Sequence, residues 1–297
     1  MKKTVLKPTK NINSYVNGDS TCLKHNTISN STILSRGNNE LSQSECDAGF
    51  NSGKSGIHSS RSIMLAEFTE LLAVVPPTAT REDYANAIIE ENILGKQTYS
   101  CRRSTNQQLG VLYGLSTTIP VFRILRKLWD IDEQGRALIA LFCAIARDAH
   151  LRSTTSTILS IPIGGELQRS AMISSITEIT GTCLNQSSLN KVASNTSNSW
   201  TQSGHLKGDH KKIRTKVSQS STAVAYAIWM GSLRGITGNT LLRTTWARLL
   251  DQTSDALFDQ VLQAKKHGLL NVSAGGGIIE INPAPLEAKK EFITWGK

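Results

Sequence analysis

The pattern of polar and apolar positions separates a non-periodic start from a strongly periodic remainder. Residues 1–63 are rich in Ser, Asn, Thr and Gly, and they follow neither the period of 2 of a strand nor the period of 3.6 of a helix. A segment of this composition buries too little apolar surface to offset its ordering entropy, so a disordered tail is predicted. Periodic sequence begins at Met64, which suggests the hypothesis that translation starts there rather than at Met1.

Helical periodicity runs through residues 64–181 and predicts a helical bundle domain. Thr80 is placed as an N-cap, because acids follow it in the first turn and Gly95 follows the expected end. Pro120 is expected to open an amphipathic helix, and Asp132 to cap the longest one. That longest run, 133–151, is apolar on nearly all sides, so it is expected to be central. Helices are expected at 81–94, 105–113, 120–130, 133–151, 152–160 and 166–179.

The sequence pattern changes after Gly181. A polar helix is predicted over 187–203, with Gly204 as its left-handed stop and Trp200 facing the core. From 212 to 217 cations alternate with Ile213, Thr215 and Val217, which is the period of a half-exposed strand. Residues 182–220 therefore predict a basic winged-helix-like unit whose hairpin carries a row of cations on its solvent face.

A second winged-helix-like unit is predicted over 221–285, where three helices precede a hairpin around glycines 275–277, and a C-terminal tail over 286–297. The fold class predicted is mainly α, a helical bundle followed by winged-helix-like units with short β-hairpins. The helix in the recognition position of the second unit carries Asp255 and Asp259, and its hairpin carries Glu280. Acids repel phosphate, so this unit is expected to dock onto protein within a larger complex.

Charge concentrates in residues 182–250, which contain the first of these units and the first part of the second. The chain has a formal net charge of +10, and residues 182–250 contain nine Lys and Arg against one acid, Asp209, a balance of +8. A polar helix joined to a basic hairpin predicts contact with the backbone of duplex DNA. The candidate nucleic-acid contacts are Asn190, Lys191, Ser194, Asn195, Gln202, Lys207, Lys211, Lys212, Arg214 and Lys216.

Motifs for nucleotide binding, metal binding or catalysis are weak in this sequence. Residues 48–55, AGFNSGKS, fit a loose P-loop pattern, but neither a strand before them nor a helix after them is predicted. His205 and His210 are expected to add contact surface rather than to bind metal, and Thr201 and Ser203 lack a base partner. The five cysteines show no ligand spacing, and Cys143 reads as a core residue. No cofactor, metal or membrane span is expected, and a cytoplasmic protein is predicted.

Two segments resemble a known family. The helical run LRKLWDIDEQGRALIALFCAIARDAHLR and the polar run SSLNKVASNTSNSWTQSGHLKG are similar to the BrxA-type proteins of bacterial BREX phage-exclusion systems, over roughly residues 80 to 280. The long polar tail and the extent of the second unit depart from that family. The resemblance implies a NusB-like helical domain, DNA binding without catalysis, and a role in antiviral defence beside larger partners.

The leading hypothesis is a non-catalytic DNA-binding component of a phage-defence system. The alternative is a protein adaptor or transcriptional regulator whose basic patch binds an acidic partner or RNA, and an enzyme is the third possibility. The salt dependence of nucleic-acid binding separates the first two.

Overall fold

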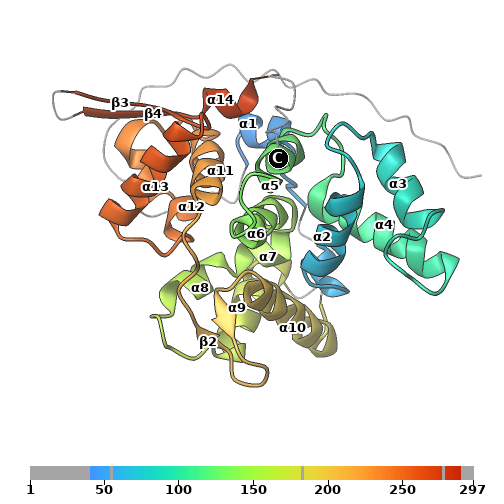
Figure 1. Cartoon of the computed structure of the whole chain (residues 1–297). Coiled ribbons are helices and arrows are strands. Elements are labelled where there is room, and N and C mark those ends of the chain that lie inside the picture. The colour runs from blue at the N-terminus through green and yellow to red at the C-terminus, as the bar shows by residue number, and fades with distance from the viewer. Residues whose placement is uncertain (1–40, 54–55, 182–183, 276–277, 289–297) are drawn as a thin grey trace, which may run out of the picture. The chain divides into compact units, whose positions relative to one another are not determined.

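Helices make up most of the described residues, which also contain two short antiparallel strand pairs (Figure 1). The computed structural model describes residues 41–53, 56–181, 184–275 and 278–288. The elements are α1 (Gln43–Ala48), η1 (Ile57–Ser59), α2 (Leu65–Val74), α3 (Arg81–Ile89), α4 (Tyr99–Tyr113), α5 (Pro120–Trp129), α6 (Arg136–Arg147), α7 (Ala149–Ser153), α8 (Thr155–Ser160), α9 (Arg169–Thr180), α10 (Gln186–Gln202), β1 (Leu206–Lys207), β2 (Ile213–Arg214), α11 (Ser221–Ser232), η3 (Gly238–Arg243), α12 (Thr245–Arg248), α13 (Ser254–Lys266), β3 (Asn271–Gly275), β4 (Ile278–Asn282) and α14 (Ala284–Glu287).

Helix α6 forms the centre of the core, as its all-round apolar sequence predicted. Every residue from 138 to 146 is buried, Cys143 among them, and helices α4, α5 and α11 pack around it. The expected cap is wrong, because Gly135 precedes α6 and Asp132 instead accepts hydrogen bonds from the Gln134 amide and the Ser220 hydroxyl. The longest of the described helices is α10 with 17 residues, against 12 for α6.

Local capping signals in the sequence set several helix ends correctly. Thr80 caps α3 in a reciprocal capping box with Asp83, and Pro120 is the first residue of α5. Two boundaries differ from the prediction. Helix α3 ends at Ile89 rather than near 94, and α4 begins at Tyr99, where Thr98 supplies a cap that the periodicity alone did not identify.

The N-terminal strap, residues 41–53 and 56–63, corrects the expected tail. It contains α1 and η1, and it buries Phe50, His58 and Ile63 against the rest of the protein. A few apolar anchors suffice here because the amides of Asn51, His58 and Ile63 also donate hydrogen bonds to other elements, so low average hydrophobicity was a poor guide. The expected boundary at Met64 therefore does not coincide with the start of folded structure, and residues 1–40 of the expected tail lie outside the described part.

A third extended segment accompanies β1 and β2. β1 pairs with β2 in antiparallel register, Leu206 opposite Arg214, and residues 164–167 bond to the other edge of β2. The amides of Gly164 and Leu167 donate to the carbonyls of Arg214 and Lys212 over 2.9 and 2.8 Å. The boundary expected at residue 182 therefore separates segments that are hydrogen-bonded to each other.

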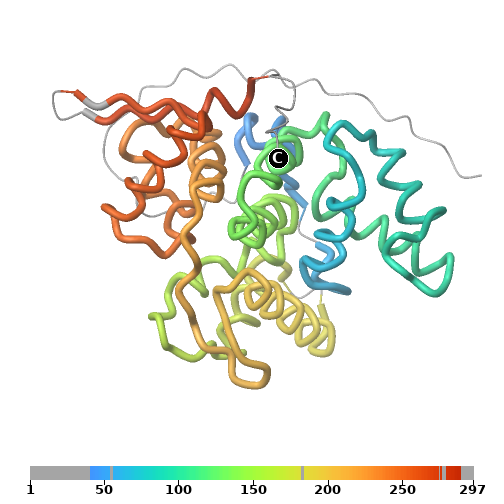
Figure 2. Tube along the Cα trace, viewed as in Figure 1, coloured from blue at the N-terminus to red at the C-terminus, as the bar shows by residue number. Residues whose placement is uncertain are grey.

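The C-terminal third contains the other strand pair. Helix α11 is buried along nearly its whole length and packs on α13, while β4 lies against η3. β3 and β4 pair antiparallel from Asn271 opposite Asn282 to Gly275 opposite Ile278. Part of the expected C-terminal tail belongs to α14, whose Leu286 is buried. Figure 2 traces this hairpin, in red, at a distance from the α10 region in yellow and gold.

Candidate nucleic-acid interface

Helix α10 is fixed by its apolar side and by both of its ends. Asn185 accepts a hydrogen bond from the Ser188 amide at the N-terminus, and Gly204, with φ of 83°, turns the chain toward β1 at the other end. Trp200 is fully buried and donates its indole N–H to Thr154 Oγ1 over 2.8 Å. Its predicted role as a core anchor is confirmed.

The polar side of α10 is divided between solvent and protein. Lys191, Ser194 and Asn198 are exposed at helical spacing, and the half-buried Thr201 continues the same line. We call these four residues the α10 stripe. Asn190 is half-buried beside it, and its carbonyl accepts from Arg169. Asn198 was missed among the candidates, although its spacing of four from Ser194 was a sufficient signal.

Two candidate contacts on α10 hold the N-terminal strap instead. Asn195 Nδ2 donates to the His58 carbonyl over 2.9 Å, and Gln202 Nε2 donates to Ser62 Oγ over 2.8 Å. Gln202 Oε1 also accepts from the Leu65 amide. The expectation that Asn195 and Gln202 face a ligand is therefore wrong in this state, because the strap, which was expected to be disordered, occupies that side of the helix.

The basic hairpin, residues 205–217, presents fewer free cations than the alternating pattern predicted. Lys207, Lys211 and Lys216 are exposed and Lys212 is half-buried, but Arg214 is only 2% exposed. Because residues 164–167 cover the outer edge of β2 and the strand is only two residues long, the period of 2 does not hold across the segment.

Arg214 instead connects the hairpin to the interior. Its guanidinium forms an ion pair with Asp251, and it donates to the carbonyls of Ile158 and His205, each over 3.3 Å. Arg214 is buried and Asp251 is largely so, with side-chain exposures of 2% and 9%. The assignment of Arg214 as a phosphate contact is therefore corrected to that of a structural anchor.

His205 is likewise internal, contrary to the expected contact role. It is fully buried between α10 and the end of α12, with Nε2 2.9 Å from the Leu249 carbonyl and Nδ1 2.8 Å from Ser203 Oγ. A carbonyl only accepts, so Nε2 carries the proton. Burial lowers the pKa of His205 to about 3, against the opposing effect of the Leu249 carbonyl, and nearby Arg214 lowers it further. His210 is exposed on the hairpin.

The remaining cations of this surface are free of acidic partners. Lys191, Lys207, Lys211, Lys212 and Lys216 form no ion pair with the described residues. Asp209 on the same hairpin and the exposed Glu166 on the segment beside β2 are the acids here, which leaves five positive charges against two, a balance of +3. A cluster of exposed, unneutralised lysines creates a positive potential that attracts polyanions.

A Ser-His-Asp arrangement also lies beneath the strap. His58 Nδ1 is 2.9 Å from Asp148 Oδ2, and His58 Nε2 is 2.7 Å from Ser199 Oγ. All three residues are fully buried, and Ser199 Oγ also accepts from the Ile63 amide. Since His58 belongs to the strap itself, uncovering Ser199 would remove its base. This buried, hydrogen-bonded network therefore holds the strap against the helices beneath it.

Asp148 gives this network its negative charge. Burial raises the pKa of Asp148, but the His58 imidazole and the Leu151 amide outweigh that effect and hold the pKa well below its usual value. Gly56 is required at this point, because a Cβ there would lie 2.2 Å from Asp148 Oδ1. The network therefore joins the strap to α7 and α10.

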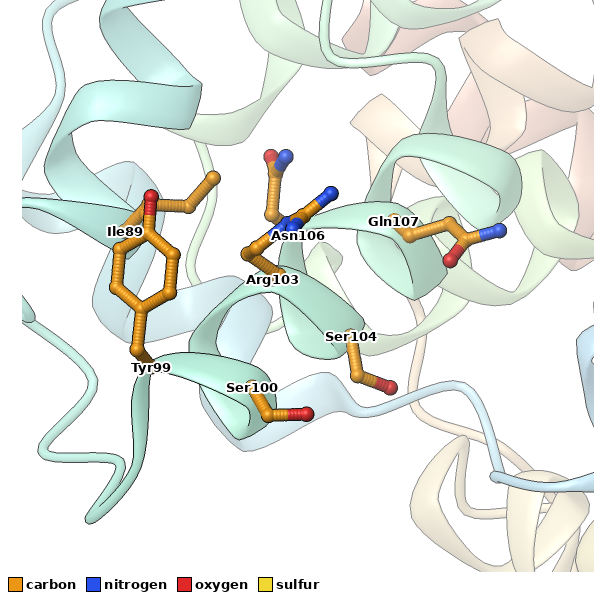
Figure 3. Close-up of a pocket in the computed structure, with 7 residues that line it drawn as sticks. All are labelled: Ile89, Tyr99, Ser100, Arg103, Ser104, Asn106 and Gln107. Atoms are coloured by element: carbon orange, nitrogen blue, oxygen red, sulfur yellow. The ribbon is translucent and has the colours of Figure 1, made fainter.

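A shallow depression of about 570 Å³ lies on the outer face of α4 (Figure 3). Tyr99, which is 54% exposed, stands beside Ile89 of α3, and Arg103 and Asn106 lie next to them. Ser100, Ser104 and Gln107 complete the lining. These residues were not predicted as a site, although the helical spacing of Tyr99 and Arg103 was the available signal. The Tyr99 hydroxyl lies 3.4 Å from a Glu90 carboxylate oxygen, so the depression is less basic than the hairpin.

Comparison of the sequence with protein-family models and with curated proteins finds no match. Among the described residues no group of three or more His, Cys, Asp or Glu is arranged to hold a metal. Within the same residues no helix combines the length and apolar character needed to span a membrane. Residues 54 and 55 of the P-loop-like motif lie outside the described part, and the motif begins at the end of α1 rather than after a strand.

Proposed function

We propose that this protein binds nucleic acid, duplex DNA in the first place, without catalysing a reaction on it. The observation that carries the proposal is the group of lysines at positions 191, 207, 211, 212 and 216, none of them paired with an acid of the described chain. Lysines of this kind release condensed counterions when they contact phosphates, and this release favours binding. The α10 stripe adds hydroxyl and amide groups beside them.

The order of elements supports contact through α10. Helices α7 and α8, the extended segment 164–167, α9, α10, β1 and β2 follow one another in the order of a winged helix, in which the helix before the hairpin meets the groove. Helices α9 and α10 pack on each other across a short connection. A winged-helix assignment for residues 149–217 is therefore part of the proposal, with α10 in the recognition position.

The second candidate function is a protein adaptor, and one observation favours it. Asp255 and Asp259 are exposed on α13, the helix that precedes β3 and β4. Acids there disfavour phosphate, so we propose that this region docks onto a protein partner while α10 and the basic hairpin hold nucleic acid. A role in phage defence beside larger subunits rests on the family resemblance and remains a prediction.

The test is binding to a labelled 30-base-pair duplex by fluorescence anisotropy across a salt series. Each phosphate contact contributes about 0.9 to the slope of log K against log salt. The triple variant Lys211→Ala, Lys212→Ala, Lys216→Ala is expected to flatten that slope by about 2 to 3. Arg214 is left unchanged, because its removal disturbs the fold. The matched control is Lys265→Ala with Lys266→Ala, two exposed lysines at the end of α13, which is expected to leave the slope unchanged.

Equal losses in the two variants would indicate nonspecific charge attraction and remove the hairpin from the proposal. Binding of single strands or RNA in preference to duplex, with the same dependence on the hairpin, would keep the interface and replace the ligand. No binding to any nucleic acid at low salt would leave the adaptor function as the better account of the basic surface.

A further inference from the structure

A small cavity of about 180 Å³ lies where the N-terminal strap meets the α11–α12 region. Its walls come from α1, α6, α7, α8 and α12 and from the connections after α1, α11 and α12. The lining residues are Leu41, Glu45, Phe50, Ile145, Arg152, Thr155, Arg234, Thr245, Trp246 and Leu249. None of them belongs to the α10 stripe or to the basic hairpin, so the cavity is separate from the proposed nucleic-acid interface.

Three charged side chains line one part of this cavity and leave an excess of one positive charge. Glu45 is only 2% exposed, and its carboxylate accepts from Arg234 Nε over 2.8 Å. The terminal nitrogens of Arg152 donate hydrogen bonds to the carbonyls of Ile145, Ala146 and Asn51. Among the lining residues there are thus two guanidinium groups and one carboxylate. Burial lowers the pKa of Arg152, which Asp148 and Glu45 oppose and Arg234 reinforces.

Arg234 has donors left over for a ligand. Its Nε is paired with Glu45, while its two terminal nitrogens make no hydrogen bond to the described residues. The side chain lines the cavity and is 46% exposed, so a ligand from solution can reach it. A guanidinium with a free pair of N–H groups matches the two oxygens of a carboxylate. Thr155 is a second unsatisfied polar group, because its hydroxyl is buried without a hydrogen-bond partner in the described chain.

Other residues of the lining are apolar or aromatic. The rings of Phe50 and Trp246 meet edge to face, with centroids 5.9 Å apart and an interplanar angle of 89°. Ile145 and Leu249 extend this surface. The aromatic ring of a ligand can pack favourably against such a pair, edge to face or offset-stacked. A cavity of about 150 Å³ accommodates benzene, so about 180 Å³ holds one ring with a small substituent and excludes a nucleotide.

We propose that this cavity binds a small anion consisting of a single aromatic ring with a carboxylate. The ring lies against Phe50 and Trp246, and the carboxylate accepts from the free nitrogens of Arg234 and neutralises the excess charge. The shape requirement follows from the volume and the aromatic walls, and the charge requirement from the two guanidiniums and one carboxylate. This site is independent of nucleic-acid binding.

Benzoate is the probe, used with the full-length protein. Binding is followed by the indole N–H signals of the tryptophans in two-dimensional NMR, with Trp246→Phe identifying the signal of Trp246. We expect benzoate to shift that signal saturably, with a dissociation constant of about 1 mM for a ligand of this size. Benzamide, which has the same shape without the charge, is expected to bind at least tenfold more weakly, and the cation benzamidine not to bind.

The variant Arg234→Gln keeps a donor for Glu45 and removes the charge, and it is expected to weaken benzoate binding at least tenfold. Arg243→Gln, an exposed arginine of η3 that lies outside the lining, is the matched control and is expected to bind as the unmodified protein does. If Arg234→Gln unfolds the protein, the comparison of benzoate with benzamide on the unmodified protein decides the question. No saturable shift of the Trp246 signal, or equal binding of both compounds, would overturn the proposal.

Discussion

His205 should make this protein sensitive to acid, and the size of the effect follows from its burial. The imidazole is fully buried and neutral, with its pKa lowered to about 3, whereas an unfolded chain has a histidine pKa of about 6.5. The unfolded state therefore binds more protons between these values. Stability from this group is complete above pH 6.5 and is lost as the pH falls toward 3.

The expected loss can be worked from the two pKa values. Protonation of His205 in the unfolded state lowers the free energy of unfolding by about 2 kcal/mol between pH 8 and pH 5, and by about 3 kcal/mol between pH 8 and pH 4. Other groups also titrate in this range, so the quantity to measure is a difference. The free energy of unfolding in urea, followed by tryptophan fluorescence, is compared between the unmodified protein and His205→Gln, whose amide retains a donor for the Leu249 carbonyl.

The difference in the free energy of unfolding between the two proteins should shrink by about 2 kcal/mol from pH 8 to pH 5. The reason is that only in the unmodified protein does a neutral, buried imidazole become exposed and take up a proton when the chain unfolds. His210→Gln is the matched control, because it removes an exposed imidazole from the same hairpin. A difference between the unmodified protein and His205→Gln that stays constant within about 0.5 kcal/mol from pH 8 to pH 5 would refute the assignment of a neutral, buried His205.

Three further predictions concern the contacts that hold the interface in place, each measured by urea unfolding at pH 8. Gly56→Ala should destabilise the protein by about 2 kcal/mol, because the added Cβ would clash with the Asp148 carboxylate. The control Gly53→Ala, whose added Cβ would meet only the flexible Asn51 side chain, should cost less than about 0.5 kcal/mol. Equal losses in the two variants would contradict the tight docking of the strap. Arg214→Ala should cost about 3 kcal/mol, because it leaves the largely buried Asp251 carboxylate with the Val217 amide as its remaining described partner, and a loss below about 1 kcal/mol would argue against a strong ion pair. Ser199→Ala should cost about 1 to 3 kcal/mol, since it removes the partner of a buried imidazole and of an amide, and an unchanged stability would mean that water replaces the hydroxyl.

Local signals predicted the helical parts of the fold well. The capping box at Thr80, the proline at the start of α5 and the apolar circumference of α6 each act within a few residues, so the sequence carries them directly. The helix at 187–203 was also predicted within one residue of α10 at each end, since Asn185 and Gly204 bound a regular pattern. Its buried face, with Trp200, followed from the same periodicity.

The candidate site was predicted only in part. Lys191, Ser194, Lys207, Lys211 and Lys216 are exposed as expected, because no side chain in the described part of the chain pairs with them. Asn195, Gln202 and Arg214 are equally polar in sequence but are bound by partners 137, 140 and 37 residues away. Helical or strand periodicity gives the direction of a side chain and contains no information about such distant partners.

The sequence by itself determined the helical class, the helix ends marked by capping residues, and the concentration of positive charge after residue 182. Only the tertiary structure decided which of those polar side chains are free. It docks the strap on one side of α10, adds residues 164–167 to the edge of β2, and buries Arg214 with Asp251 and His205 beneath Leu249. The physical reason is that a buried polar group must find a partner, and in this protein those partners come from segments far away in the chain.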